Sequence, residues 1–97
     1  YLINCGGANL ITEGIKELKK LTNKKIGGYG NSEKIDISNE DRSDRPEEDH
    51  WASATPIDEE EYAKEAEIWV KEGASIVAGC CRTRPAHIKE IVRTLNI

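Results

Sequence analysis

Short apolar runs alternate along this chain with segments in which apolar residues recur every three or four positions. The runs at 1–4 and 75–79 have the length of buried strands, and a glycine-rich run at 25–30 predicts a weaker strand between them. The periodic segments predict a helix after each strand, with the apolar faces Ile11, Ile15, Leu18 and Leu21; Tyr62, Ala66, Trp69 and Val70; and Ile88, Ile91, Val92 and Leu95. The order β-α-β-α-β-α predicts parallel strands joined by crossover helices, and therefore an α/β fold.

Local end signals fix where two of these helices are predicted to begin. Thr55 followed by Pro56 predicts an N-cap and a first helical position, and Gly73 predicts the end of the same helix. Pro85 predicts the start of the last helix in the same way.

Residues 31–55 form a long polar stretch that breaks the pattern. They hold eight acidic side chains against three basic ones, which gives a local charge of -5. A segment this long without secondary structure is typical of a functional or mobile loop. The spacing of its acids does not match a calcium-binding EF-hand loop. His50 and Trp51 near its end could form a substrate lid or anchor the loop on the body of the domain.

Composition narrows the class of protein. The 97 residues suffice for one small domain, and a net charge of -4 argues against non-specific nucleic-acid binding. Because no apolar run reaches about 18 residues and no signal peptide is visible, we expect a soluble protein without membrane contact. An odd number of cysteines, two of them adjacent, favours the reducing cytoplasm. The chain starts at Tyr1 inside an apolar run, so we expect a fragment of a longer protein.

The three cysteines follow predicted strands. Cys5 ends the first strand, and Cys80 and Cys81 end the third, so parallel pairing would bring all three to one rim. Three thiolates can bind one zinc ion and leave a fourth position for a reacting thiol, a site suited to attack by sulfur on an alkyl group. Small buried core residues, a disulfide between the adjacent pair and a redox switch remain alternatives. His50 and His87 lack the paired spacing of zinc ligands.

Residues 78–85 read Ala-Gly-Cys-Cys-Arg-Thr-Arg-Pro and closely resemble the Gly-Gly-Cys-Cys-Arg-Thr-Thr-Pro signature of the homocysteine S-methyltransferases. Asn4 and Cys5 resemble the family's earlier Asn-Cys motif. Residues 29–33 (Tyr-Gly-Asn-Ser-Glu) resemble its Tyr-Pro-Asn-Ser-Gly segment, and Trp51 stands where a Trp often follows. The resemblance therefore extends in order through nearly the whole chain.

The resemblance implies a (β/α)8 TIM barrel, of which residues 1–97 would be the last three βα units, strands 6–8 of a single homocysteine-binding domain. It implies a Zn2+ ion held by Cys5, Cys80 and Cys81. It also implies transfer of a methyl group from a small onium donor (S-methylmethionine or S-adenosylmethionine) to homocysteine, forming methionine; betaine and methylated folates serve other branches. A fragment of this size is not expected to be active alone, because its sheet edges would be open.

Three departures from the family pattern carry expectations. Ala78 replaces the first Gly of the signature without removing a ligand. Arg84 replaces the second Thr, which removes a helix cap at a cost of about 1 kcal/mol and places a cation where it meets a substrate carboxylate or solvent. Gly30 in place of Pro is expected to loosen the second loop. A non-catalytic zinc-binding relative and a thiol redox protein are the alternative functions.

Overall fold

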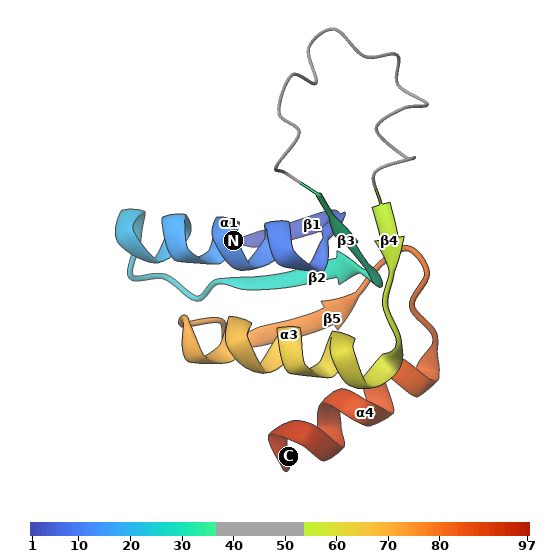
Figure 1. Cartoon of the computed structure of the whole chain (residues 1–97). Helices are drawn as coiled ribbons and strands as arrows, with labels where there is room; N and C mark the ends of the chain where they lie inside the picture. Colours follow the sequence, from blue (N-terminus) through green and yellow to red (C-terminus); the bar gives the residue numbers. More distant parts are fainter. Residues whose placement is uncertain (37–53) are drawn as a thin grey trace, which may run out of the picture.

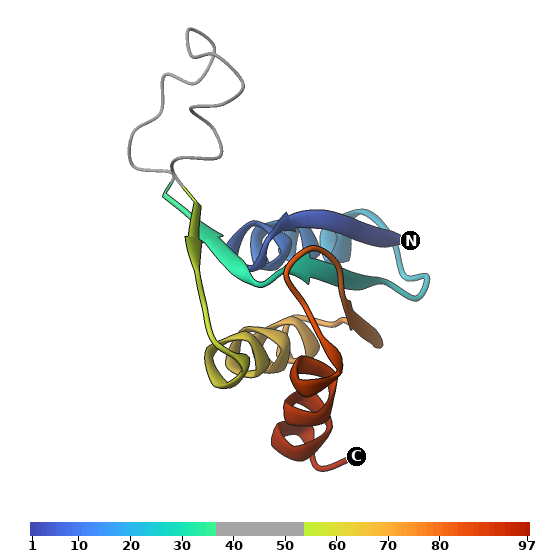
Figure 2. The same ribbon diagram turned by 90° about the vertical axis from the view of Figure 1, so that its right-hand side faces the viewer.

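The centre of the protein is a parallel sheet of three strands. The computed structural model describes residues 1–36 and 54–97. Strands β1 (Leu2–Gly7), β2 (Gly27–Asn31) and β5 (Ile76–Gly79) lie in the order β1-β2-β5, and both pairings are parallel. Helices α1 (Ala8–Leu21) and α3 (Glu59–Lys71) lie side by side on one face of this sheet (Figures 1 and 2). The predicted α/β class with parallel strands is therefore confirmed.

Helix α4 (Pro85–Leu95) follows β5 and packs against α3, and it begins at Pro85 as predicted. Its predicted apolar face is only partly covered, because Ile91 is buried whereas Ile88 and Val92 are exposed. In the two described ranges, no helix is both long enough and apolar enough to cross a membrane.

The predicted loop 31–55 contains a short strand at each of its ends, so the predicted bounds of the loop are wrong. Strand β3 (Glu33–Ile35) pairs in antiparallel register with β4 (Ala54–Pro56). The side chain of Asn9 on α1 donates to the carbonyl of Ile35 at 2.9 Å and accepts from its N–H at 3.0 Å, so it holds the free edge of β3. The predicted lid or anchor at residues 50–51 falls in the range 37–53, outside the described residues.

The predicted start of the second helix is also wrong. Thr55 and Pro56 are extended in β4, and the N-cap of α3 is Asp58, whose Oδ1 accepts from the backbone N–H of Glu61 at 2.8 Å. Pairing with β3 keeps the chain extended through Pro56, and an aspartate is then available as a cap two residues later.

The core lies between the sheet and its two covering helices. Tyr62 and Trp69 of α3 are fully buried and meet edge to face with ring centroids 5.7 Å apart. The other face of the sheet is covered by no described element, so Leu2 is 50% exposed and Ile76 is 47% exposed. The prediction of a buried first strand is therefore wrong for the side chains that point to this face.

A buried polar network joins the two covering helices. The Thr12 hydroxyl donates to Oε1 of Glu65 at 2.6 Å and accepts from the Trp69 indole N–H at 2.9 Å. Oε2 of Glu65 lies 3.8 Å from the Lys34 ammonium. Every polar group in this network therefore has a partner, as buried polar groups require.

Candidate metal centre

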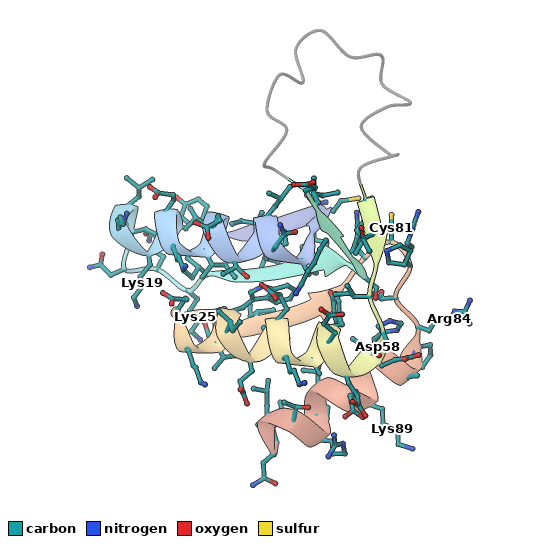
Figure 3. All side chains as sticks on the ribbon, viewed as in Figure 1. Lys19, Lys25, Asp58, Cys81, Arg84 and Lys89 are labelled. Carbon is teal, nitrogen blue, oxygen red and sulfur yellow. The ribbon has the colours of Figure 1, made fainter. Side chains whose placement is uncertain are left out.

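The structure brings the three cysteines together at the C-terminal ends of the parallel strands. Their sulfur atoms all lie within 4.8 Å of one another, and the Sγ atoms of Cys5 and Cys81 are 3.7 Å apart. Figure 3 shows Cys81 at the rim toward which the arrowheads of β2 and β5 point. All three are free thiols, and Cys5 and Cys81 are exposed. This exposure does not fit the alternative of small buried core residues.

The donor set fits a zinc ion in both chemistry and size. Thiolates are preferred zinc ligands, with metal–sulfur distances of about 2.3 Å and tetrahedral geometry, which places two sulfur ligands about 3.8 Å apart. The separation of 3.7 Å between Cys5 and Cys81 matches this value. The side chains need only small movements to hold a cation between them.

Cys5 reaches this cluster through an irregular backbone. The pairing of β1 with β2 shifts register between Asn4 and Gly7, and Cys5 lies in the shifted stretch with a φ of 56°. Left-handed backbone is uncommon for a residue other than glycine and costs about 1–3 kcal/mol, and such strain clusters at functional sites. A bulge of this kind re-aims a side chain, here toward the thiols that follow β5.

The end of β2 holds the loop that carries Cys80 and Cys81, called the cysteine loop below. The N–H of Cys80 donates to the carbonyl of Gly30 at 2.9 Å, and the N–H of Cys81 donates to Oδ1 of Asn31 at 3.0 Å. The carbonyl of Cys81 accepts from the N–H of Ser32 at 3.0 Å. The chain turns directly after β5, as two adjacent ligands require. Neither Asn31 nor Ser32 was predicted as a site residue, although both lie in the segment that resembles the family's second motif.

Two glycines, one at the end of β5 and one inside β2, leave no room for a side chain. A methyl group added at Gly79 would lie 2.5 Å from Oγ1 of Thr83, whose hydroxyl donates to the carbonyl of Cys80 at 2.6 Å. Gly30 is buried inside β2, and a methyl group there would lie 2.8 Å from a side-chain carbon of Ile11. The expectation that Gly30 loosens a loop is therefore wrong, because α1 packs directly on this position.

Crowding of the sulfur atoms raises the pKa of the Cys5 thiol to about 11, first through its contact with Cys80 and then through its contact with Cys81. A thiolate beside two other sulfur atoms is disfavoured, so the thiol of Cys5 holds its proton at neutral pH unless a cation is present. A divalent cation bound here would take the place of the thiol protons and offset the negative charge of the thiolates.

His87 organises the start of α4 rather than offering a ligand. The Ser32 hydroxyl donates to the carbonyl of Ile57 at 2.7 Å, so it accepts from Nε2 of His87 at 3.0 Å. Nδ1 of the same ring accepts from the backbone N–H of Arg84 at 3.0 Å. Both ring nitrogens are used by a neutral imidazole that is nearly fully buried. Arg84 lacks the hydroxyl of a Thr cap, and the side chain of His87 instead accepts from the N-cap N–H, which is one half of a capping box.

Arg84 and Arg82 line a cavity of about 160 Å3 beside the cysteine loop. Asp58 and Glu59 line the same cavity, so two acids accompany the two cations. Figure 3 shows Arg84 and Asp58 near the start of α4, below the rim that carries Cys81. The contact of Arg84 with a substrate carboxylate therefore stays a prediction.

Comparison with known proteins gives one consistent result. Residues 1–95 match the family model described as homocysteine S-methyltransferase. The chain is 35% identical over 95 residues to homocysteine S-methyltransferase 3 of Zea mays, a match that covers 97% of this chain and 25% of that protein. It is 40% identical over 90 residues to homocysteine S-methyltransferase YbgG of Bacillus subtilis (strain 168), covering 92% of this chain and 25% of that protein.

A third relative is named for a different methyl acceptor. Selenocysteine Se-methyltransferase of Brassica oleracea var. italica is 34% identical over 94 residues, a match that covers 96% of this chain and 25% of that protein. The chain thus spans about a quarter of the length of the curated relatives it matches. No solved structure gives a significant match.

Proposed function

Because the chain belongs to the homocysteine S-methyltransferase family, we propose that it forms the metal-binding part of an enzyme that methylates homocysteine to methionine. The methyl donor in this proposal is a small onium compound, S-methylmethionine or S-adenosylmethionine. The observation that carries the proposal is the convergence of three free thiols within 4.8 Å at the C-terminal rim of a parallel sheet. We place the reaction in the cytoplasm, where free thiols persist.

Cys5, Cys80 and Cys81 would hold a Zn2+ ion and leave one tetrahedral position open. Bound zinc would supply a Lewis acid that keeps the substrate sulfur deprotonated at neutral pH. The exposure of Cys5 and Cys81 supports access of a second small molecule to the same rim. The backbone N–H groups of Cys80 and Cys81 donate to the Gly30 carbonyl and to the Asn31 side chain, and these bonds would keep the adjacent cysteines in place while a substrate exchanges.

We further propose that these residues supply strands 6–8 of a (β/α)8 barrel. Two observations support this: β1 and β5 are both edge strands, and Leu2 and Ile76 are half exposed on the sheet face that carries no helix. In a barrel the edges pair with other strands, and side chains on that face fill the interior in layers. A barrel of about 250 residues is compatible with the greater length of the relatives.

The test uses the complete gene product that contains these residues. We expect elemental analysis to find zinc in the unaltered protein, and a methionine-formation assay to detect turnover with homocysteine and one of the two donors. Cys80→Ala should abolish both zinc retention and methyl transfer, whereas Lys89→Ala, a change on the exposed side of α4, should leave both intact. Full activity of Cys80→Ala without bound zinc would refute the proposal.

The alternatives give different results in the same experiment. A non-catalytic zinc-binding relative retains zinc and forms no methionine. A thiol redox protein binds no metal and forms a reversible disulfide between Cys80 and Cys81 on oxidation. Selenocysteine should be assayed beside homocysteine, because a 34% identical relative is named for that acceptor.

A further inference from the structure

One buried acid at the metal centre has no role in the function proposed above. Glu33 begins β3 and is only 2% exposed. Its Oε1 accepts from Nδ2 of Asn31 at 2.8 Å, whereas its Oε2 is buried without a hydrogen-bond partner. The guanidinium of Arg82 is the charged group that faces Oε2, with Nε at 3.9 Å. A carboxyl oxygen left in this state is unusual and calls for a reason.

The contacts of Glu33 lead to Cys81 from two sides. Asn31, which donates to Glu33, accepts from the backbone N–H of Cys81 through its own Oδ1 at 3.0 Å. Arg82 follows Cys81 in the chain and has a φ of 64°, in the left-handed region. Glu33 therefore contacts Asn31, which accepts from the N–H of Cys81, and Arg82, which is the residue that follows Cys81.

The chemistry of an ionised carboxyl group explains why an acid occupies this place. The side-chain amide of Asn31 has a donor end and an acceptor end of nearly the same shape, so packing alone does not fix its orientation. An ionised carboxylate only accepts, and it therefore fixes the donor end toward Glu33 and the acceptor end toward Cys81. Its negative charge also attracts Arg82, which favours the uncommon backbone of that residue.

We propose that Glu33 is a positioning residue that sets the orientation of Cys81 in the cysteine loop through Asn31 and Arg82. The inference rests on the proposed metal function and adds to it a carboxyl group that contacts no ligand sulfur. Groups that orient metal ligands in this way commonly change metal affinity by about 10–100-fold when they are altered.

The test compares Glu33→Gln with a matched variant of a second buried acid, Glu65→Gln. Glu65 contacts Thr12 and Lys34, and among the described residues no hydrogen bond or ion pair joins it to Asn31, Arg82 or a cysteine. Two quantities are measured in the complete gene product: zinc affinity, by competition with a chromophoric chelator, and hydrogen exchange of the Cys81 amide in metal-free protein. We expect Glu33→Gln to weaken zinc binding by about 10–100-fold and to accelerate exchange of the Cys81 amide, while Glu65→Gln changes neither. Substitution with cobalt should show an altered absorption spectrum for Glu33→Gln alone.

Equal behaviour of the two glutamine variants would overturn the inference. If Glu33→Gln does not fold, Arg82→Gln takes its place, because Arg82 is exposed and its loss leaves the core intact. We then expect a weaker zinc affinity and faster exchange at Cys81, and unchanged values overturn the inference. If the unaltered protein binds no zinc, the proposed function fails, and the exchange of the Cys81 amide still decides whether Glu33 orients that residue.

Discussion

Replacing Tyr62 by phenylalanine tests how the two strands beneath the cysteine loop are held together. The Tyr62 hydroxyl lies 2.6 Å from the carbonyl oxygen of Gly30 on β2 and 2.9 Å from that of Ala78 on β5. The Gly30 carbonyl also accepts from the N–H of Cys80, so the hydroxyl contacts the same carbonyl that holds the cysteine loop. The change removes one oxygen and keeps the ring, whose edge contact with Trp69 is retained.

The expected cost follows from the proton count of these groups. A phenol has one proton, so the Tyr62 hydroxyl donates to one carbonyl at a time. A net hydrogen bond contributes about 1 kcal/mol, and a buried carbonyl that loses its partner costs about 1–3 kcal/mol. Because Gly30 keeps its bond from Cys80, the lower part of this range applies, and we expect Tyr62→Phe to reduce the free energy of unfolding by about 1–2 kcal/mol.

A second variant separates the hydroxyl from the ring. Tyr62→Leu also removes the edge contacts with Trp69 and His87, whose centroids lie 5.7 Å and 5.5 Å away. Each aromatic pair contributes about 0.5–1.5 kcal/mol, so the total cost rises to about 2–5 kcal/mol.

Urea unfolding of the complete gene product, followed by circular dichroism, measures both variants. We expect the midpoint to fall at an unchanged slope, in the order unaltered protein, Tyr62→Phe, Tyr62→Leu. A midpoint of Tyr62→Phe equal to that of the unaltered protein would refute the reasoning, since the hydroxyl would then add nothing to the pairing of β2 with β5.

Three further predictions use the same unfolding measurement. Burial, and then the nearby Cys80, raise the pKa of Tyr62 above its usual value of about 10. Above that pH the folded state retains a proton that the unfolded state loses, so the free energy of unfolding should fall as the pH rises above about 10. Tyr62→Phe should flatten this dependence on pH. Asp58→Ala should cost about 1 kcal/mol through loss of the cap on α3, whereas Thr55→Ala should cost less than about 0.5 kcal/mol; the reverse order would contradict the observed helix start. Gly79→Ala should cost about 1–3 kcal/mol and weaken zinc binding, because the added methyl group meets Thr83 at 2.5 Å; unchanged zinc affinity would show that the loop accommodates it.

The elements with local end signals could be predicted from the sequence. The strand at 75–79 and the helix that starts at Pro85 agree with the structure to within one residue, because an apolar run and a proline at the first helical position act on their own neighbours. The start of α3 could not be predicted in this way. Thr55 and Asp58 are both good caps, and the choice between them depends on the pairing of β4 with β3, twenty residues away in the chain.

Part of the candidate site could also be predicted from the sequence, and part could not. The parallel order of strands was enough to bring Cys5 to the rim that carries Cys80 and Cys81. Glu33 could not be identified, because it is one of eight acids in a polar stretch and nothing in its neighbours marks it as buried. Its side chain contacts Asn31 and Arg82, and the second of these is distant in sequence.

The arrangement of the three thiols also bears on the order in which the chain folds. Cys5 and Cys81 are 76 positions apart; Cys5 lies in the edge strand β1 and Cys81 follows the edge strand β5, and the two edge strands are joined through the central strand β2. The three thiols are therefore together only after both edge strands have paired, and such distant pairings form slowly because a long loop must close first. A metal ion bound by these cysteines would link β1 to the loop that follows β5. It would resist unfolding as a cross-link does and select the completed sheet over partly folded forms.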